Sequence, residues 1–231
     1  DDEDYVKSFL ASSSNESQPP KIVVYNNKVI NFHAATICTD DESSLGSAIL
    51  IRDVTEEKQL EKELRKMSFT DKLTGLYNRR HMEDILSKEF IRSRRYKLDM
   101  SLIFFDVDHF KKFNDTYGHD MGDRVLEELG KAVDNKFRDP DIPCRYGGEE
   151  FCVIMPNTND TGAMIAAEKL RKKVESLDID GVSVTITIGV ASYPLSESKT
   201  PEELLKAADM ALYRGKAGGR NRVVSWHDVK D

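Results

Sequence analysis

The chain has 231 residues, of which 39% are hydrophobic, and its 34 Lys and Arg against 41 Asp and Glu give a net charge of -7. This length and composition predict one or two globular domains with hydrophobic cores. The acidic balance disfavours a nucleic-acid polymer, because such binding depends on Lys and Arg at phosphates, so we expect no partner of that kind. No apolar run approaches the roughly 18 residues of a membrane span, and we expect no membrane contact within this chain.

The three cysteines, Cys38, Cys144 and Cys152, form no Cys-x-x-Cys pair. Their odd number is typical of reduced thiols and predicts a cytoplasmic protein. Because the chain begins with Asp1 rather than Met, we expect it to be part of a longer protein, with room upstream for a sensor or a membrane anchor.

Residues 1–55 predict a small β segment behind a polar N-terminus. Three runs rich in β-branched residues, at 22–25, 29–37 and 47–52, are separated by turn residues. With its closing sequence Arg-Asp-Val-Thr at 52–55, this antiparallel meander resembles the C-terminal half of a PAS sensor domain. A β appendage without a sensory role is the alternative.

Residues 56–69 predict a helical linker. Leu60, Leu64 and Met67 lie at positions i, i+4 and i+7, a spacing that suits a coiled-coil seam between two parallel chains. The run is shorter than the roughly three heptads of an established coiled coil. An ordinary amphipathic linker is therefore an equal alternative.

The rest of the chain, residues 70–231, predicts one further domain. Strands are predicted from continuous or alternating apolar residues, at 101–107, 143–146, 151–155, 182–190 and 222–226. Helices are predicted where apolar residues recur every three or four positions, at 78–96, 123–137, 161–176 and from Thr200 to Gly218. On the third of these helices, Ile165, Leu170 and Val174 are expected to face the core. The order βαββαβ predicts an α+β sheet with helices on one face.

Two adjacent glycines, Gly147 and Gly148, stand between two strand-like runs. They predict a tight β-hairpin, because the favoured two-residue turns need positive φ. Two carboxylates, Glu149 and Glu150, follow the glycines directly. A solvated acidic turn is the simpler interpretation of this hairpin taken alone.

A second acidic element favours a metal site. The apolar run at 101–107 contains Asp106 near its end, where the carboxylate would emerge at the edge of the sheet beside Glu149. Hard cations such as Mg²⁺ bind carboxylate oxygens together with substrate phosphates. The strand end and the acidic hairpin therefore predict a divalent-cation site of the nucleotidyl-transfer type. Asp108, just beyond the strand, is expected to be structural.

The sequence Gly-Gly-Glu-Glu-Phe at 147–151 resembles the signature of the GGDEF-type diguanylate cyclases, in its Glu-Glu variant. Residues 71–80 are similar to the entry motif of that family, and 105–115 and 118–123 to its metal-binding and base-binding segments. Residues 211–221 resemble its closing motif. The resemblance covers about residues 70 to 226. It implies a palm-like nucleotidyl-cyclase fold, with a mainly antiparallel central sheet in βαββαβ order flanked by helices.

The resemblance also implies a set of metal ligands. It places Mg²⁺, or Mn²⁺ as a substitute, on Asp106, on the backbone carbonyl of Val107 and on Glu149. Glu150 would assist as a ligand or as the general base. The catalytic role is not divided between Glu149 and Glu150 at this stage.

The resemblance assigns the base of GTP to Asn114 and Asp123. An Asp carboxylate accepts from the N1–H and N2–H₂ donors of guanine, which adenine lacks, so a site built for those donors rejects ATP. The local sequence alone also allows both residues to be turn or N-cap residues, because a Gly-containing loop is expected between them.

The resemblance assigns the β- and γ-phosphates to Lys216 and Arg220, with Lys111 and the backbone near Phe110 assisting. For Lys216 and Arg220, a cation that favours the dipole at the end of a helix is the alternative. Residues around Gly215 do not form a P-loop, because the required Gly and Ser/Thr positions are absent.

Arg138 and Asp141 match the Arg-x-x-Asp spacing of the inhibitory product site of the family. There the Arg would bind a phosphate of cyclic di-GMP and the Asp would accept from guanine. Lys169 or Arg171 from a partner subunit would complete the site. The alternative is a turn after a helix, since Asp-Pro-Asp is common turn chemistry.

The function implied by the resemblance is a Mg-dependent diguanylate cyclase, which condenses two GTP into cyclic di-GMP and pyrophosphate. One subunit would hold one GTP, so we expect a homodimer with product feedback inhibition. A non-catalytic module that binds GTP or cyclic di-GMP is the first alternative. A cyclase of a single nucleotide is the second, although it would not need the guanine-binding pair.

Overall fold

The computed structural model describes residues 21–38, 44–60 and 69–229. The chain divides into two compact units, Asp1–Lys66 and Met67–Asp231. The division falls inside the linker predicted at 56–69, of which 61–68 lie outside the described residues, so the coiled-coil seam stays a prediction. No helix in the described ranges combines the length and the apolar character that crossing a membrane requires.

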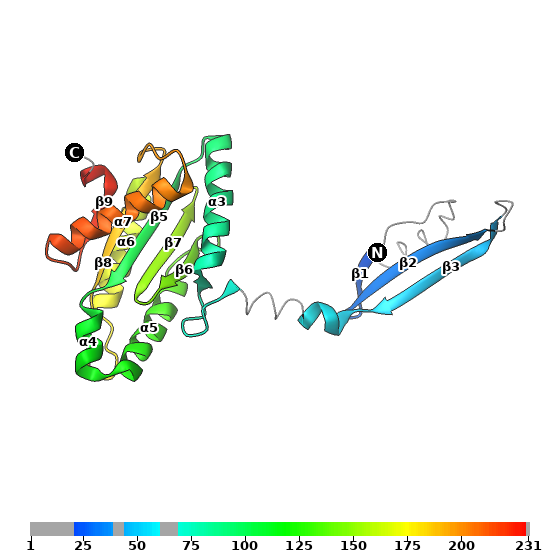
Figure 1. The fold of residues 1–231 in the computed structure, drawn as a ribbon, viewed down its shortest axis with the longest axis horizontal. Coiled ribbons are helices and arrows are strands. Elements are labelled where there is room, and N and C mark those ends of the chain that lie inside the picture. The colour runs from blue at the N-terminus through cyan, green and yellow to red at the C-terminus, as the bar shows by residue number, and fades with distance from the viewer. Residues whose placement is uncertain (1–20, 39–43, 61–68, 230–231) are drawn as a thin grey trace. The chain divides into compact units, whose positions relative to one another are not determined.

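The first unit contains a three-stranded antiparallel sheet (Figure 1). Its strands pair in the order β1-β2-β3 and comprise Lys21–Tyr25, Lys28–Cys38 and Ser44–Asp53. Asn26 and Asn27 form the first turn with φ of 45° and 62°, which Asn adopts more readily than most residues. The predicted meander is confirmed, whereas the PAS resemblance stays a prediction.

The second unit contains a six-stranded mixed sheet in the order β4-β6-β7-β5-β8-β9. The strands are β4 Tyr77–Asn78, β5 Met100–Val107, β6 Ile142–Gly147, β7 Glu150–Pro156, β8 Ile186–Tyr193 and β9 Val223–Ser225. The two outermost pairs are parallel and the three inner pairs are antiparallel. The prediction of a mainly antiparallel central sheet is therefore confirmed.

Five α-helices flank this sheet. They are α3 Arg79–Tyr96, α4 Phe110–Tyr117, α5 His119–Asp134, α6 Asp160–Glu175 and α7 Pro201–Ala217, and a 3₁₀ turn at Trp226–Val229 follows β9. Thr200 caps α7 as predicted, with its hydroxyl accepting from the N–H of Glu203 at 3.2 Å. α4 has no counterpart among the predicted helices, and α5 begins four residues earlier than predicted.

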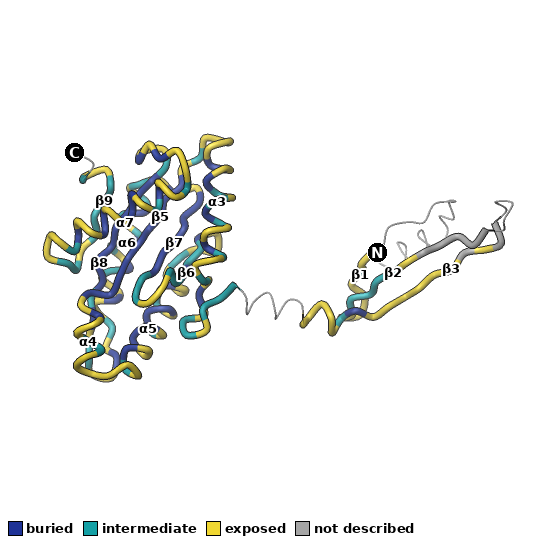
Figure 2. The backbone as a smooth tube through the Cα atoms, viewed as in Figure 1, coloured by how far each residue is buried: buried dark blue, intermediate teal, exposed yellow. Residues whose placement is uncertain are grey.

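Helices cover both faces of the sheet, and the prediction of helices on one face is wrong (Figure 1). α4, α5 and α6 pack on the face that includes Ile103 and Phe105, and α3 and α7 pack on the face that includes Leu102 and Phe104. The reason is the sequence of β5, which is buried at every position (Figure 2). A strand that is apolar on both sides needs a covering layer on each.

The inward face of α6 also differs from the prediction. Leu170 and Val174 are fully buried, but Ile165 is 52% exposed. Ala163 and Ala167 occupy the buried positions instead, in helical register with Leu170. Small residues there let α6 lie close to the sheet.

Candidate active site

The predicted strand end and the acidic hairpin are neighbours in the sheet. Asp106 of β5 lies opposite Glu150 of β7, and the N–H of Val107 donates to the carbonyl oxygen of Glu149 at 3.3 Å. The two elements predicted to bind a metal therefore meet where these inner strands of the sheet end. Their adjacency follows from the antiparallel pairing of β5 with β7.

The turn of the hairpin is one residue further along the chain than predicted. Gly147 pairs with Glu150, so the two turn residues are Gly148 and Glu149. Of the two glycines only Gly148 has a positive φ, at 52°. The pairing shifts between Arg145 and Gly147, which accommodates the extra residue as an irregularity in β6. Glu149 consequently lies at the very tip of the hairpin.

The surroundings of the Asp106 carboxyl group disfavour its ionised form. Its residue is 7% exposed, and burial raises the pKa to about 6. The ammonium of Lys216, 2.9 Å from Oδ2, opposes that rise, whereas Glu149 and Glu150 add to it. Burial also raises the pKa of Glu150, against the opposing charge of Lys216. Carboxylates crowded in this way favour a cation between them.

The donor set fits a hard divalent cation. Asp106, Glu149 and the carbonyl of Val107 offer only oxygen atoms, which Mg²⁺ prefers, and Mg²⁺ normally completes its shell with water and substrate phosphates. Within the described ranges, no three His, Cys, Asp or Glu side chains gather tightly enough to hold an ion alone. Two carboxylates with a backbone carbonyl therefore suit an ion that arrives with its substrate.

The residues predicted for the base lie on two helices that meet at Gly118, which has a φ of 85°. Asn114 is inside α4 and Asp123 is inside α5, so the turn and N-cap alternatives are wrong. The side-chain Oδ1 of Asn114 is buried without a hydrogen-bond donor in the described residues. A buried acceptor without a donor costs about 1–3 kcal/mol, which a ligand donor would recover.

Gly122 explains how Asn114 reaches this position. A Cβ atom built on Gly122 would lie 2.0 Å from Oδ1 of Asn114 and 3.2 Å from the ring of Phe110. The space that Gly122 leaves open is therefore filled by the amide of Asn114. The motif at 118–123 includes this glycine, but no local pattern shows that its missing side chain makes room for Asn114.

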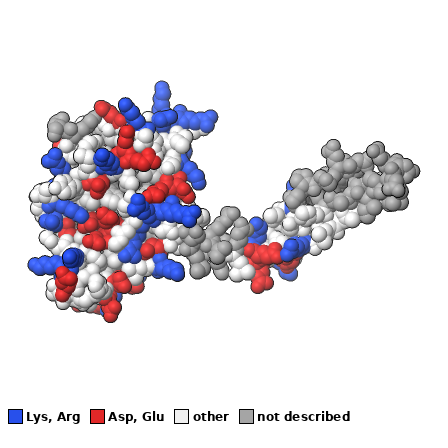
Figure 3. Space-filling model, in the orientation of Figure 1, with Lys and Arg blue, Asp and Glu red and all other residues white. Residues whose placement is uncertain are grey.

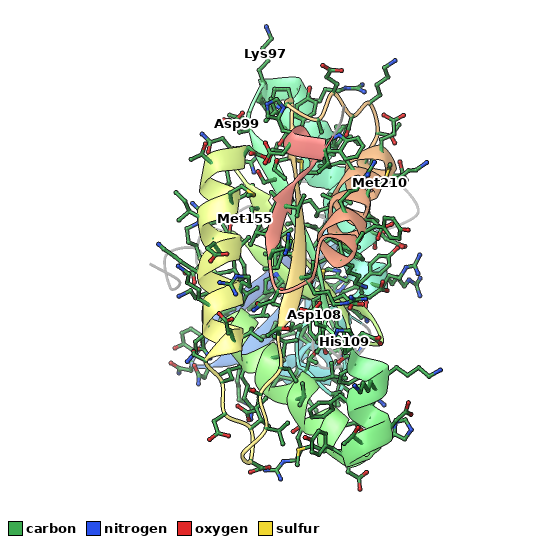
Figure 4. The ribbon with its side chains drawn as sticks, turned by 90° about the vertical axis from the view of Figure 1, so that its left-hand side faces the viewer. Lys97, Asp99, Asp108, His109, Met155 and Met210 are labelled. Carbon is green, nitrogen blue, oxygen red and sulfur yellow. The ribbon has the colours of Figure 1, made fainter. Side chains whose placement is uncertain are left out.

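The residues predicted for the phosphates come from α4 and from the chain after α7. Phe110 and Lys111 open α4, whose N-cap residue His109 has a φ of 59° and makes no side-chain cap. Asp108 and His109 lie where β5 gives way to α4 (Figure 4). An uncapped helix N-terminus is a suitable anion site. Arg220 lies in the loop after α7, half-buried, with a φ of 64°.

Asp108 is structural, as predicted. Its carboxylate accepts from the hydroxyls of Thr185 at 2.7 Å and Thr187 at 2.5 Å, and from the N–H of Asn221 at 3.0 Å. One side chain thus joins the end of β5 to the segment before β8 and to the loop after α7.

The predicted product-site pair forms an ion pair within the chain. The guanidinium of Arg138 donates to Oδ1 of Asp141 at 2.8 Å and to Oδ2 at 3.1 Å, and also to the hydroxyl of Thr158 at 2.7 Å. The Asp141 side chain is 1% exposed and that of Arg138 is 57% exposed. The Arg138 side chain is therefore open to solvent, whereas the Asp141 carboxylate is buried and already paired with it.

Of the two residues proposed to complete that site, Arg171 is excluded by its contacts. Its guanidinium binds Glu168, Glu175 and Asn221, and its side chain is 12% exposed. Lys169 is exposed and remains the candidate. The visible face of this unit mixes acidic and basic side chains (Figure 3).

Sequence reasoning missed the residue that holds the hairpin. Arg145 donates from Nη1 to Asp71 at 3.0 Å and from Nε to the carbonyl of Gly148 at 2.9 Å. Burial acts to raise the pKa of Asp71, but hydrogen bonds from Thr74 and Arg145 hold it below its usual value. Asp71 and Arg145 are 74 positions apart, so no local pattern could pair them.

Comparison with known proteins agrees with this geometry. A family described as "Diguanylate cyclase, GGDEF domain" matches residues 68–222, and the chain belongs to that family. It is 44% identical over 165 residues to the response regulator PleD of Caulobacter vibrioides, covering 69% of this chain and 36% of PleD. It is 40% identical over 177 residues to the diguanylate cyclase DgcM of Escherichia coli, covering 76% of this chain and 43% of DgcM. The chain thus spans less than half the length of these two relatives.

Solved structures show the same fold. The coiled coil and GGDEF domain of DgcB from Caulobacter crescentus, in complex with c-di-GMP, has a TM-score of 0.69 and 30% identity, covering 74% of this chain and 93% of that one. The active GGEEF domain of a diguanylate cyclase from Vibrio cholerae has a TM-score of 0.62 and 32% identity, covering 64% and 96%. The palm-like nucleotidyl-cyclase fold predicted from the sequence is confirmed.

The burial of Asp106 predicts a pH-dependent stability. Its folded pKa of about 6 lies above the ordinary value of 3.8, so ionisation opposes folding increasingly between pH 4 and 6 and fully above pH 6. Asp106→Asn removes this charge. With a chelator present at pH 8, the variant should unfold at a higher temperature than wild type, with a gain of up to about 3 kcal/mol in the free energy of unfolding. At pH 4 its unfolding temperature should not exceed that of wild type.

Thermal unfolding followed by circular dichroism measures this difference. Asp139→Asn, which changes an exposed carboxylate, should show no such pH-dependent gain. Added Mg²⁺ should stabilise wild type and leave Asp106→Asn unchanged. A variant less stable than wild type at pH 8 would contradict the electrostatic account.

Proposed function

We propose that this chain is a diguanylate cyclase, which condenses two GTP into cyclic di-GMP with release of pyrophosphate. The observation that carries the proposal is the meeting of Asp106, Val107 and Glu149 where β5 ends beside the hairpin that leads into β7. Membership of the GGDEF family supports the same reaction. The intact motif at 147–151 favours turnover over a module that only binds nucleotide.

Asp106, Glu149 and the carbonyl of Val107 would hold Mg²⁺, with Mn²⁺ as a substitute. When bound, the ion neutralises the triphosphate and lowers the pKa of the attacking 3′-hydroxyl. Glu150 accepts the proton of that hydroxyl, a role that its raised pKa suits. Lys216, which pairs with Asp106 in the free chain, would be released to bind a phosphate oxygen if Asp106 held the ion.

The base and the phosphates are bound by separate groups. Asp123 accepts from the N1–H and from one N2–H of guanine. Oδ1 of Asn114, which has no hydrogen-bond donor among the described residues, accepts from the other N2–H. Lys111, the N–H groups at Phe110 and the side chain of Arg220 bind the phosphates. Adenine offers no donor at N1, so ATP is rejected.

The reaction joins two GTP, whereas the described monomer has one set of residues for binding the base and the phosphates of GTP. We therefore propose a homodimer in which each subunit presents one GTP, so that the 3′-hydroxyl of one attacks the α-phosphate of the other. Product feedback through Arg138 and Asp141 is part of the same proposal. The structure of DgcB in complex with c-di-GMP supports product binding within the family.

Glu149→Gln tests the catalytic assignment. The substitution keeps the size of the side chain and removes the charge at the hairpin tip, so cyclic di-GMP formation should fall at least about 100-fold, or about 2.7 kcal/mol. Chromatography of a reaction with GTP and Mg²⁺ measures the product. Glu127→Gln, on the exposed side of α5, is the matched control and should remain active.

Near-normal turnover by Glu149→Gln would refute the metal site. If wild type binds GTP but forms no product, the chain is a regulatory module instead. Formation of a cyclic mononucleotide would identify the single-nucleotide alternative.

Gly122→Ala tests the base site. The new Cβ would lie 2.0 Å from Oδ1 of Asn114 and must displace that amide, which is the end of a flexible side chain. Alanine also favours a helix interior by up to about 1 kcal/mol over glycine. The KM for GTP should rise about 10-fold, an effect of about 1.4 kcal/mol, while stability is kept or increased.

A double-mutant cycle makes this prediction specific. In an Asn114→Ala background, Gly122→Ala should not raise the KM further. Gly130→Ala is the contrasting control, because its Cβ would meet the backbone of Thr74 at 3.0 Å and should lower stability instead. Equal KM values for wild type and Gly122→Ala would remove Asn114 from the base site.

Arg138→Ala tests feedback. Loss of the exposed guanidinium should abolish inhibition by added cyclic di-GMP, with an initial rate little changed. In the described residues its side-chain hydrogen bonds go to Asp141 and Thr158, and neither is a proposed metal or GTP ligand. Initial rates measured across product concentrations report the inhibition. Lys136→Ala, a nearby exposed cation, should stay inhibited. Equal inhibition of wild type and Arg138→Ala would reduce the pair to a turn.

A further inference from the structure

The loop after α7 contains two consecutive residues in the left-handed region, Arg220 with φ of 64° and Asn221 with φ of 46°. Each such non-glycine residue costs on the order of 1 kcal/mol or more, and persists only where surrounding contacts hold it. Arg220 is the residue proposed above to bind a phosphate of GTP. The contacts that hold this loop therefore bear on how Arg220 is presented.

Asn221 uses all its polar side-chain atoms for contacts with α6. Its Oδ1 accepts from Nη1 of Arg171 at 2.7 Å, and its Nδ2 donates to Oε1 of Glu175 at 2.7 Å. Its backbone N–H donates to Oδ2 of Asp108 at 3.0 Å and to the hydroxyl of Thr187 at 3.1 Å. One residue thus ties the loop to α6, to β8 and to the end of β5.

The side chain of Arg171 is also held by contacts within α6. Its Nε and Nη2 donate to the two carboxylate oxygens of Glu168 at 2.9 Å, and its Nη1 donates to Oε2 of Glu175 at 2.9 Å. These carboxylates raise the pKa of the guanidinium. Bidentate pairing fixes the plane of a guanidinium, so Nη1 points at Asn221 in one orientation.

The backbone of Arg220 is also bound to α7. Its N–H donates to the carbonyl of Gly215 at 3.1 Å, and its own carbonyl accepts from Nε of Arg222 at 3.1 Å. Gly215 directly precedes Lys216, which pairs with Asp106. The C-terminal end of α7 therefore supports both Lys216 and the loop. A shift of Asn221 would move Arg220 relative to Lys216.

We propose that Arg171 and Glu175 are positioning residues for nucleotide binding, which act through Asn221 to direct Arg220 toward the phosphates of GTP. The inference rests on the proposed function, because it takes Arg220 as a phosphate ligand. It gives Arg171 a role inside one subunit in place of the product-site role that its burial excludes. The base contacts of Asn114 and Asp123 are not affected by this arrangement.

Asn221→Asp is the primary variant. Asp tolerates a left-handed backbone and keeps an oxygen for Arg171, but it places a carboxylate where Nδ2 donated to Glu175. The KM for GTP should rise about 10-fold, equivalent to about 1.4 kcal/mol, while kcat changes less than about threefold. Adding Glu175→Gln to the same chain should restore the KM, because the new amide can donate to the introduced carboxylate.

The binding of GTP and of GMP to the full chain, measured by calorimetry, separates phosphate positioning from a general loss of structure. Asn221→Asp should weaken GTP binding about 10-fold and leave GMP binding unchanged, because GMP lacks the β- and γ-phosphates. In an Arg220→Ala background, Asn221→Asp should have no further effect. Lys173→Ala, an exposed change on the same helix, should bind both nucleotides as wild type does.

An unchanged KM in Asn221→Asp, a parallel loss of GMP affinity, or failure of Glu175→Gln to restore the KM would each overturn the proposal. An Arg220→Ala variant with wild-type GTP affinity would overturn it as well. The binding measurements need no turnover. If wild type forms no cyclic di-GMP, but calorimetry shows that Asn221→Asp weakens GTP binding alone and that Glu175→Gln restores it, the positioning role stands and the cyclase activity is refuted.

Discussion

The site depends on one strand, β5, which is buried at all eight positions and ends beside the hairpin with Asp106 still enclosed. Antiparallel pairing with β7 on one side and β8 on the other fixes where that carboxylate lies. Burial makes its ionised form costly, and the neighbouring glutamates increase that cost. The strand that stabilises the core therefore also places a carboxylate whose ionised form is costly without a cation nearby.

The hairpin is held from outside the sheet by the turn that precedes α3. Arg145 joins Asp71 of that turn to the carbonyl of Gly148. The same turn lies against α5, where a side chain on Gly130 would meet Thr74. One segment thus contacts both the element that carries the acidic tip and the helix that carries Asp123. Any displacement of the turn would reach the proposed metal ligands and the proposed base site together.

Sequence patterns predicted the positions of the helices and strands better than the contacts between them. The apolar run of β5 and the acidic hairpin were evident because strand burial and turn chemistry are local. The apolar run of β5 also implied a layer of helices on each face, which the one-face prediction overlooked. The hairpin turn was misplaced by one residue because the register shift in β6 has no local signature. Contacts such as Asp71 with Arg145, or Asp108 with Asn221 across 113 positions, have no local signature. The amide of Asn114 over Gly122 likewise depends on how α4 meets α5.

Two cations assigned to anionic ligands are paired with carboxylates of the chain, Lys216 with Asp106 and Arg138 with Asp141. Each pairing avoids an unpartnered charge in the free protein, so ligand binding becomes an exchange of partners rather than a simple addition. The exchange leaves a carboxylate behind, and Asp106 and Asp141 are both largely buried. In the proposed function, a divalent ion would compensate the first carboxylate and guanine donors would compensate the second. Under that proposal, phosphate binding at Lys216 would be coupled to metal binding at Asp106, because the charges at the site balance only when both ligands are bound.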